Sequence, residues 1–335
     1  CSPIFANRES KTLQLEHASA DELAHTEQQL AEAYQSILKQ NLKLDLTRGK
    51  PSAEQLSLSD ALDGILDGDY RSANGTDVRN YGGIDGLAEI KQLGAEVLGV
   101  QNNEILAGGN SSLSLMFQAM THAVQFGFNG ADSAWKNTEG ARFLCPVPGY
   151  DRHFTVCEQF GLEMIPVAMT ASGPDMDQVE RLVAEDSRIK GMWCVPKYSN
   201  PTGVVYSDET VERIAKLGQI AAQDFKVFWD NAYAVHDLNA HAQSLAPIMD
   251  YCRQHQTEDS VLQFASTSKI THAGAGVAFM AASPANLASF KKVLGVSTIG
   301  PDKINQLRHA RFLPDLNALS AHMQKHAAII KPRFA

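Results

Sequence analysis

Residues 261–282 read VLQFASTSKITHAGAGVAFMAA, in which two apolar runs flank a polar turn that contains Lys269. Runs that are apolar on successive residues are typical of strands whose two faces are both covered by helices. Similar short runs alternate with helical stretches from about residue 85 onward, at 142–146, 163–169, 189–195 and 225–229. The alternation predicts an α/β fold of three layers, αβα, with a mostly parallel central sheet.

The composition is that of a globular chain with a large apolar core. Of its 335 residues 44% are hydrophobic and 20% charged, which excludes intrinsic disorder and fibrous structure. The net charge is −9 and no basic run stands out, so we expect no nucleic-acid partner. No apolar stretch reaches the roughly 18 to 20 residues that span a bilayer, so we expect a soluble protein with no membrane partner. The five cysteines are widely spread without a CxxC pair, which favours a reducing, cytoplasmic setting.

The polar residues that follow each apolar run are the candidates for a functional site. Ligands of an open α/β sheet bind beyond the carboxyl ends of its strands. Five features occupy such positions. They are the glycine-rich turn 108–112 before a helix, the proline turn that presents Tyr150, and the residues Asn200, Asp230 and Lys269. Each has an ordinary structural explanation by itself, as a helix N-cap, a rim tyrosine, a turn, an ion pair or a lysine that reaches solvent. Only their combination points to a ligand.

One ligand uses all five places. Backbone N–H groups and hydroxyls of a glycine-rich turn suit a phosphate, and an aromatic side chain suits a flat ring. A buried carboxylate such as Asp230 needs a cation or strong donors. A desolvated lysine has a lowered pKa and a free amine, so Lys269 is a candidate for a Schiff base with an aldehyde. Pyridoxal 5'-phosphate offers the phosphate, the ring, a cationic ring nitrogen, a phenolic oxygen and the aldehyde.

Other site classes lack their motifs in this chain. It contains no Walker loop, no GxGxxG after a first strand, no GxSxG elbow and no HExxH. The eleven histidines show no paired spacing of the kind that metal ligands have. Nucleotide, hydrolase and metal sites are therefore not expected.

Six motifs occur in the order in which fold-type I aminotransferases carry them. They are NYGGIDGL (80–87), GGNSSLSLM (108–116), PVPGYDRHF (146–154), PKYSNPTG (196–203), WDNAYAVHDL (229–238) and FASTSKITHAGAG (264–276). From about residue 42 to 330 the chain therefore resembles this superfamily of pyridoxal-phosphate enzymes. LDLTRGKPS (44–52), SNPTGVVYS (199–207) and GPDKINQLRHARF (300–312) further resemble the divergent bacterial subgroup of aspartate aminotransferases.

The resemblance implies a role for each matching residue. Lys269 matches the lysine that holds pyridoxal phosphate as a Schiff base and later moves a proton. Asp230 matches the carboxylate that faces the pyridine nitrogen, Asn200 and Tyr233 match the donors to the phenolic oxygen, and Tyr150 matches the stacking aromatic. The remaining matches are to the phosphate: Asn110, Ser111, Ser112 and Ser266 in the same subunit and Tyr81 from the neighbouring one, which implies a homodimer with a composite site.

Two features depart from the family pattern. Val277 stands eight residues after the lysine, where most relatives place an arginine on the phosphate, and His272 is the candidate replacement. The arginine for the substrate α-carboxylate lies in the family's C-terminal small domain. We expect that domain to be incomplete, because the sequence ends at Ala335 soon after a helix predicted over 315–330. Cys1 in place of a methionine fits a processed or a partial chain.

The resemblance also divides the chain into domains. It assigns residues 1–50, a helix that begins after Ser19 and an extended arm, to the small domain. Residues 51–310 form the large cofactor-binding domain and residues 311–335 the start of the C-terminal small domain.

The expected activity is ping-pong transamination through a Schiff base, from an L-amino acid to a 2-oxo acid. The subgroup resemblance favours L-aspartate and 2-oxoglutarate, with Arg48 and Arg308 as candidates for the distal carboxylate. The alternatives are a β-lyase or decarboxylase that uses the same cofactor, a transcription regulator with an aminotransferase-like domain, and a truncated relative without activity.

Overall fold

The computed structural model describes residues 18–43, 49–239 and 242–333, and its contacts divide the chain into two units, Cys1–Lys50 and Pro51–Ala335. In the first unit the described residues form the predicted helix, α1 (Ala20–Lys39), whose cap is the expected box of Ser19 and Glu22. Residues 44–48 of the predicted arm lie outside the described residues. The assignment of the first unit to a small domain stays a prediction.

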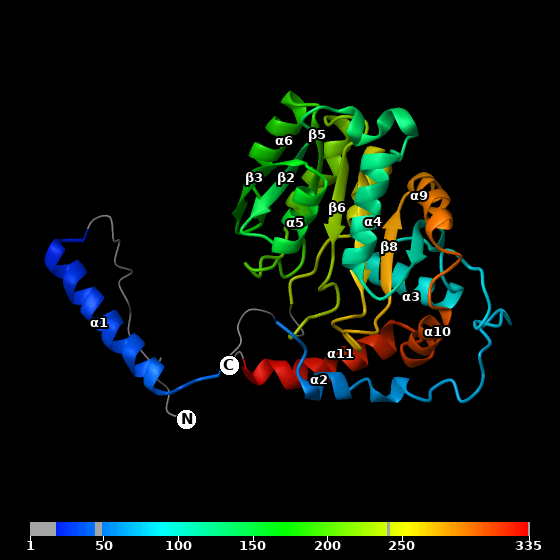
Figure 1. Ribbon diagram of the computed structural model, residues 1–335, viewed down its shortest axis with the longest axis horizontal. Coiled ribbons are helices and arrows are strands. Elements are labelled where there is room, and N and C mark those ends of the chain that lie inside the picture. The colour runs from blue at the N-terminus through cyan, green and yellow to red at the C-terminus, as the bar shows by residue number, and fades with distance from the viewer. Residues whose placement is uncertain (1–17, 44–48, 240–241, 334–335) are drawn as a thin grey trace. The chain divides into compact units, whose positions relative to one another are not determined.

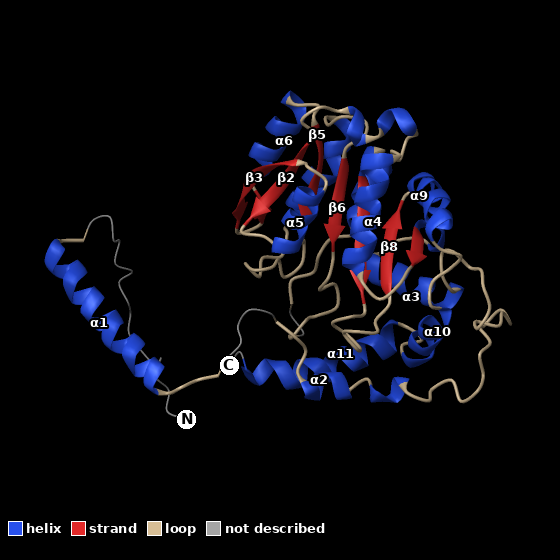
Figure 2. Ribbon diagram, viewed as in Figure 1, coloured by secondary structure: helices blue, strands red, loops and turns tan. Residues whose placement is uncertain are grey.

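The second unit is built on a sheet of eight strands among the described residues (Figures 1 and 2). In spatial order the strands are β1 (Ile105–Ala107), β8 (Ala278–Ala282), β7 (Val261–Ser266), β6 (Lys226–Asp230), β5 (Ile189–Cys194), β2 (Arg142–Val147), β3 (Glu163–Thr170) and β4 (Gly173–Pro174). The five strands from β7 to β3 are parallel to one another. The predicted, mostly parallel sheet is therefore confirmed.

Strand β8 runs antiparallel to both β7 and β1. Residues 267–277 between β7 and β8 contain no helix that could cross over the sheet, so the chain returns beside the strand that it has just left. The return places Lys269 at the carboxyl edge of β7, where the parallel strands also end.

Helices cover both faces of the sheet. One face packs against α4 (Ser112–Gln125), α5 (Asp151–Gln159) and α9 (Pro284–Ser297). The other packs against α6 (Met176–Glu185), α7 (Asp208–Lys216), α8 (Ile248–His255), α3 (Ala88–Leu98), α10 (Lys303–Phe312) and α11 (Leu316–Ile330), with the short α2 (Ala53–Ser57) beside α11. Met280 and Phe279 of β8 belong to opposite layers, because successive strand residues point to opposite faces. The three-layer αβα prediction is confirmed.

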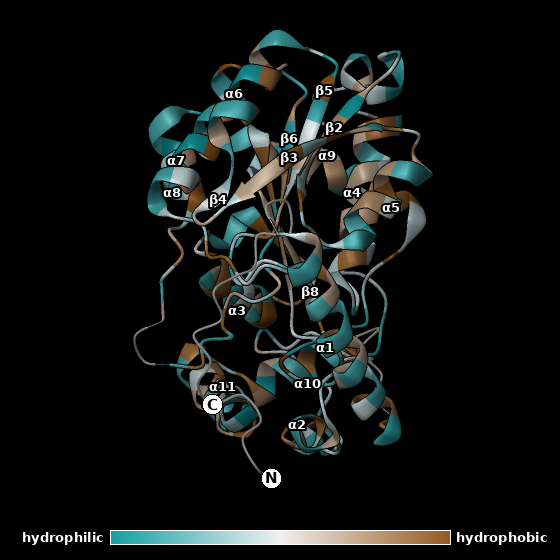
Figure 3. Ribbon diagram, turned by 90° about the vertical axis from the view of Figure 1, so that its left-hand side faces the viewer, coloured by the Kyte–Doolittle hydropathy of each residue, from teal (hydrophilic) through white to brown (hydrophobic). Residues whose placement is uncertain are grey.

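The central strands are buried along their whole length, which explains why their sequences are apolar without alternation. Figure 3 shows the complementary pattern in outer helices such as α6 and α7, where hydrophilic residues predominate and hydrophobic ones interrupt them. Val211 and Ile214 of α7 are fully buried, so these interruptions face the sheet.

The segment around residue 306 forms a helix that the sequence analysis did not assign. Residues Lys303–Phe312 are themselves a helix, α10, in which Gln306, Leu307 and His309 are buried. The polar side chains of α10 are used for hydrogen bonds to loops, so an apolar pattern alone does not reveal the helix. Whether residues 311–335 begin a separate domain stays a prediction.

No helix in the described part of the chain is long and apolar enough to cross a membrane. Four of the cysteines, Cys145, Cys157, Cys194 and Cys252, are free and buried. The compartment inferred from the cysteines stays a prediction.

Candidate active site

Asp230 is the last residue of β6 and is 4% exposed. Its Oδ2 atom accepts a hydrogen bond from Nε2 of His153 at 3.0 Å. Its Oδ1 atom is buried and has no hydrogen-bond partner among the described residues. Because a buried carboxylate oxygen is costly without a donor, Oδ1 is the place where a ligand donor fits.

His153 is a site residue for which the sequence analysis gave no role. It lies on α5, three residues after Tyr150, and its ring stacks on Trp193 with centroids 4.2 Å apart and planes 8° apart. The Tyr150 ring meets it edge-on at 5.1 Å. The stacked imidazole therefore fixes one oxygen of Asp230 while Tyr150 stands beside it. The signal for His153 was its position one helical turn after Tyr150.

Lys269 lies in the turn after β7, with its Nζ atom 3.9 Å from the centroid of the Tyr233 ring. Tyr233 follows β6, so the structure brings together two predicted residues that are far apart in the sequence. Lys269 is exposed in the described chain, which corrects the expected desolvated position. A cation above an aromatic face is favourable even where water reaches it.

The glycine-rich turn and the lysine turn are joined by backbone and side-chain hydrogen bonds. Gly108 N donates to Ala278 O at 2.8 Å, and Ala278 N donates to Gly109 O at 2.7 Å. The Asn110 amide donates to Gly274 O at 3.0 Å, and Ser268 Oγ donates to Asn110 O at 2.8 Å. The two loops thus form one rim, in which the Asn110 amide nitrogen already holds the opposite loop.

The N-terminus of α4 opens toward that rim. Ser111 caps the helix and accepts from Ser114 N at 3.3 Å, and Ser112 is the first helical residue. A Cβ atom built on Gly109 meets no heavy atom within 4 Å, so the turn borders open space. Exposed N–H groups at a helix N-terminus, next to open space, are suited to an anion such as a phosphate.

Side chains of helix α10 form hydrogen bonds with both loops, a role that the sequence analysis missed. Gln306 Nε2 donates to the carbonyls of Ala107 and Gly108 at 3.1 and 3.0 Å, and its Oε1 accepts from Leu87 N at 2.9 Å. Asn305 Nδ2 donates to Ala275 O and to Gly276 O, at 3.0 Å each. Such contacts depend on the tertiary path of the chain and leave no sequence pattern of their own.

The loops after β5 and β6 are tied together next to Asn200 and Tyr233. Lys197 is 5% exposed, and its Nζ atom lies 2.8 Å from Asp237 Oδ1 and donates to Ala234 O at 3.1 Å. The Tyr198 hydroxyl donates to the same Asp237 oxygen at 2.7 Å. Lys197 and Asp237 therefore fix the spacing between the loops that carry Asn200 and Tyr233.

Among the remaining candidates, Tyr81 and His272 make other contacts. Tyr81 is 85% exposed, and Lys303 of α10 donates to the carbonyls on either side of it, at Asn80 (2.8 Å) and Gly82. Nε2 of His272, the candidate replacement for the missing arginine, lies 3.8 Å from Asp60. Two further candidates are Arg308, which is half-buried on α10, and Arg48, which lies outside the described residues.

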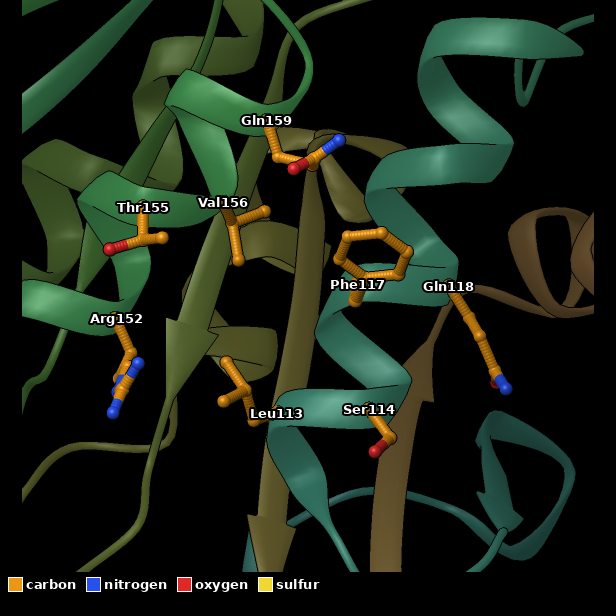
Figure 4. Close-up of a pocket in the computed structure, with 8 residues that line it drawn as sticks. All are labelled: Leu113, Ser114, Phe117, Gln118, Arg152, Thr155, Val156 and Gln159. Carbon is orange, nitrogen blue, oxygen red and sulfur yellow. The ribbon is translucent and has the colours of Figure 1, made fainter.

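A groove of about 440 Å³ lies between α4 and α5 (Figure 4). Its lining includes Leu113, Phe117 and Val156, with Arg152 at its side. The predicted site residues do not line this groove. The candidate chemistry lies instead at the carboxyl edge of the sheet, where Asp230, Tyr233 and Lys269 converge.

Comparison with known proteins decides the family. A family model described as aspartate amino-transferase matches residues 18–335. The aspartate aminotransferase of Corynebacterium glutamicum is 44% identical over 96% of this chain and 74% of its own length. The chain belongs to the aspartate amino-transferase family. It is therefore an aminotransferase, as its motifs predicted.

Solved structures of other aminotransferases share the fold of this chain. An aspartate transaminase from Corynebacterium glutamicum superposes with a TM-score of 0.90 at 44% identity and covers 96% of this chain and 75% of that chain. The α-aminoadipate aminotransferase LysN of Thermus thermophilus, solved with N-(5'-phosphopyridoxyl)-L-leucine, is 20% identical with a TM-score of 0.65 over 85% of this chain and 68% of that chain. At that identity LysN supports the fold alone, which is the predicted fold type I.

Proposed function

We propose that this aminotransferase binds pyridoxal 5'-phosphate and moves an amino group from L-aspartate to 2-oxoglutarate. The observation that carries the cofactor is the orphaned Oδ1 atom of Asp230, since a protonated ring nitrogen is the donor that such an oxygen needs. The open space at Gly109, at the N-terminus of α4, suits the phosphate. The residues present therefore fit the cofactor.

When bound, the cofactor supplies an aldehyde that condenses with amines and a ring that takes up the electron pair released at the substrate Cα. Asp230 holds a proton at the ring nitrogen, and His153 keeps the carboxylate oriented for it. Asn200 and Tyr233 donate to the phenolic oxygen. Lys269 would hold the aldehyde carbon through Nζ, and its amine, when free, would carry the proton from the substrate Cα. Two such half-reactions, with an amino acid and then with a 2-oxo acid, form the ping-pong cycle.

The residues around this centre would hold the rest of the cofactor. Ser111, Ser112 and Ser266 bind the phosphate through hydroxyl and backbone N–H groups, and the Asn110 backbone N–H joins them. Tyr150, which meets His153 edge-on, would hold the ring of the cofactor by stacking. The relative named aspartate aminotransferase, at 44% identity, supports L-aspartate as the donor. Arg308 stays the candidate for the distal carboxylate.

We further propose that the site is completed by a second copy of the chain. Tyr81, Val296 and Ile299 are 85%, 89% and 63% exposed. Gly300 packs against the backbone of Gly82, which brings the Tyr81 and Ile299 segments together. Large apolar side chains that are this exposed support an interface between subunits. Through it, Tyr81 would reach the phosphate site of the neighbouring subunit.

The test is an absorbance scan of the purified chain with pyridoxal 5'-phosphate, before and after L-aspartate, beside a Lys269→Ala control. We expect a visible band that the control lacks and that L-aspartate removes, with oxaloacetate as the product. A band that other amino acids remove, but L-aspartate does not, would reject the substrate. Release of ammonia or carbon dioxide would indicate the lyase or decarboxylase instead. A chain without a lysine-dependent band would reject the cofactor assignment.

A further inference from the structure

The turn that carries Lys269 has carbonyl groups that its own backbone does not satisfy. Ile270 N and Thr271 N both donate to Thr267 O at 2.8 Å, so residues 267–271 form a single helical turn. A helical turn that ends there leaves its last carbonyls without partners inside the turn. Ile270 is 4% exposed, so its carbonyl needs a donor from another part of the protein.

Histidines from other elements provide these donors. His236, in the loop after β6, places Nε2 3.3 Å from Lys269 O. His322 and His326, one turn apart on α11, each place Nε2 2.8 Å from Ile270 O. Because a carbonyl oxygen only accepts, each of these Nε2 atoms carries the hydrogen, which fixes the tautomer of all three rings.

The two histidines of α11 are held in place on their other sides. They are 4% and 2% exposed. The Gln55 amide of α2 lies 3.4 Å from Nδ1 of His326, the atom left free to accept, and the Phe312 ring meets His322 edge-on at 5.1 Å. Burial lowers the pKa of both imidazoles, which favours their neutral form, and their Nε2 atoms are 3.2 Å apart. Two neutral donors therefore converge on one oxygen.

One donor would satisfy the Ile270 carbonyl. A second donor, on the same oxygen, restricts the direction of the C=O bond, because each N–H prefers the plane and the lone-pair directions of the carbonyl. The restricted peptide unit follows Lys269 by one residue. Only one peptide unit lies between it and the Lys269 Cα, and the carbonyl of that intervening unit is held by His236, so the clamp limits how the turn that carries the Lys269 side chain can move.

We propose that His322 and His326 are positioning residues for Lys269, which clamp the Ile270 carbonyl from α11 and so direct Nζ toward Tyr233 and the carboxyl edge of the sheet. The proposal rests on the proposed function, in which Lys269 is the lysine that binds the cofactor. A misdirected amine would lose reactivity toward the aldehyde, since a displacement of about 1 Å at a reacting group costs on the order of 100-fold in rate.

The test compares the reactivity of Lys269 in four forms of the full chain: wild type, His322→Ala/His326→Ala, His322→Gln/His326→Gln, and Leu319→Ala. Glutamine keeps an N–H donor. Leu319 is a 2% exposed residue of the same helix in the apolar cluster, so its variant controls for a loosened α11. Competitive acylation of the cofactor-free chain, quantified at Lys269 relative to the exposed Lys39 of α1, measures the amine directly. The rate of band formation with pyridoxal 5'-phosphate is the second readout.

We expect the double alanine variant to change the Lys269 to Lys39 labelling ratio and the rate of band formation by about tenfold each. The glutamine pair should reverse most of this change in the ratio and the rate. Leu319→Ala should lower Tm but leave the labelling ratio and the rate of band formation unchanged. An unchanged ratio in the double alanine variant, or the same change in Leu319→Ala, overturns the proposal. If the double alanine variant does not fold, the single alanine variants decide by the same ratio, and no change in either overturns it.

The two readouts separate the positioning role from the proposed function. If the double alanine variant changes the labelling ratio but the wild type forms no lysine-dependent band, the positioning role is supported and the cofactor is rejected. A normal wild-type band with unchanged ratios in every variant supports the cofactor and rejects the positioning role.

Discussion

His153 Nε2 donates to Asp230 Oδ2 across 3.0 Å while the His153 ring lies flat on Trp193. Helix α5 thus occupies one oxygen of the carboxylate at the end of β6. The second oxygen is left buried without a partner in the described part of the chain. One oxygen of Asp230 therefore has a structural partner, and the other is left for a ligand.

Replacement of His153 by phenylalanine should keep the stacking on Trp193 but remove the donor to Asp230. The buried carboxylate then loses a hydrogen bond, and we expect the free energy of unfolding to fall by about 1–3 kcal/mol. Affinity for pyridoxal 5'-phosphate should fall as well, measured by absorbance titration. His122→Phe, at a buried histidine among Phe126, Phe128 and Phe290, is the control and should keep the affinity. Equal affinities in the two variants would contradict the role of His153.

Two glycine substitutions should separate the phosphate rim from the fold. A Cβ atom on Gly109 meets nothing within 4 Å, so Gly109→Ala should keep Tm but lower the affinity for pyridoxal 5'-phosphate, because the methyl group enters the space assigned to the phosphate. A Cβ atom on Gly276 would lie 2.8 Å from Ser268 N, so Gly276→Ala should lower Tm. Thermal scans and absorbance titrations of both variants test this, and an unchanged affinity of Gly109→Ala would place the phosphate elsewhere.

The ion pair between Lys197 and Asp237 should respond unequally to loss of either partner. Lys197 is buried, so Asp237→Asn leaves an ammonium group with a weaker partner, and we expect a loss of about 1–3 kcal/mol. The Asp237 side chain is 42% exposed, so Lys197→Met leaves it in contact with water and should cost less. Urea unfolding of the two variants gives the order. A larger loss in Lys197→Met would mean that packing of the lysine stem outweighs the charge.

Acid should destabilise the protein in part through His122. Burial lowers the pKa of His122 from 6.5 to about 4. The unfolded chain therefore takes up a proton on this side chain before the folded one does, and stability falls as the pH falls from about 6.5 to about 4. Above this window His122 is neutral in both states and contributes no pH dependence. Urea midpoints at pH 7.5 and 5 should differ less in His122→Phe than in the wild type, and an equal difference would contradict the assignment.

The sequence by itself determined the buried strands, the layered fold class and the first helix. Buried parallel strands need apolar residues on both faces, so runs such as 189–195 and 261–266 identify β5 and β7. Ser19 and Glu22 identify the start of α1, because a capping box is a local interaction. The placement of Asp230 and Lys269 at one edge of the sheet also followed, since the carboxyl ends of neighbouring strands share one edge, whereas Tyr233 was named only by the family resemblance.

Only the tertiary structure decided the contacts between residues far apart in the chain. That His153 binds Asp230, that Gln306 reaches the Gly108 carbonyl, and that His322 and His326 meet the Ile270 carbonyl depend on how helices pack over the sheet. A polar side chain on a helix shows no pattern that names its distant partner. The physical reason is that a buried hydrogen bond is selected by geometry in three dimensions, whereas periodicity along the chain records only which face of an element is apolar.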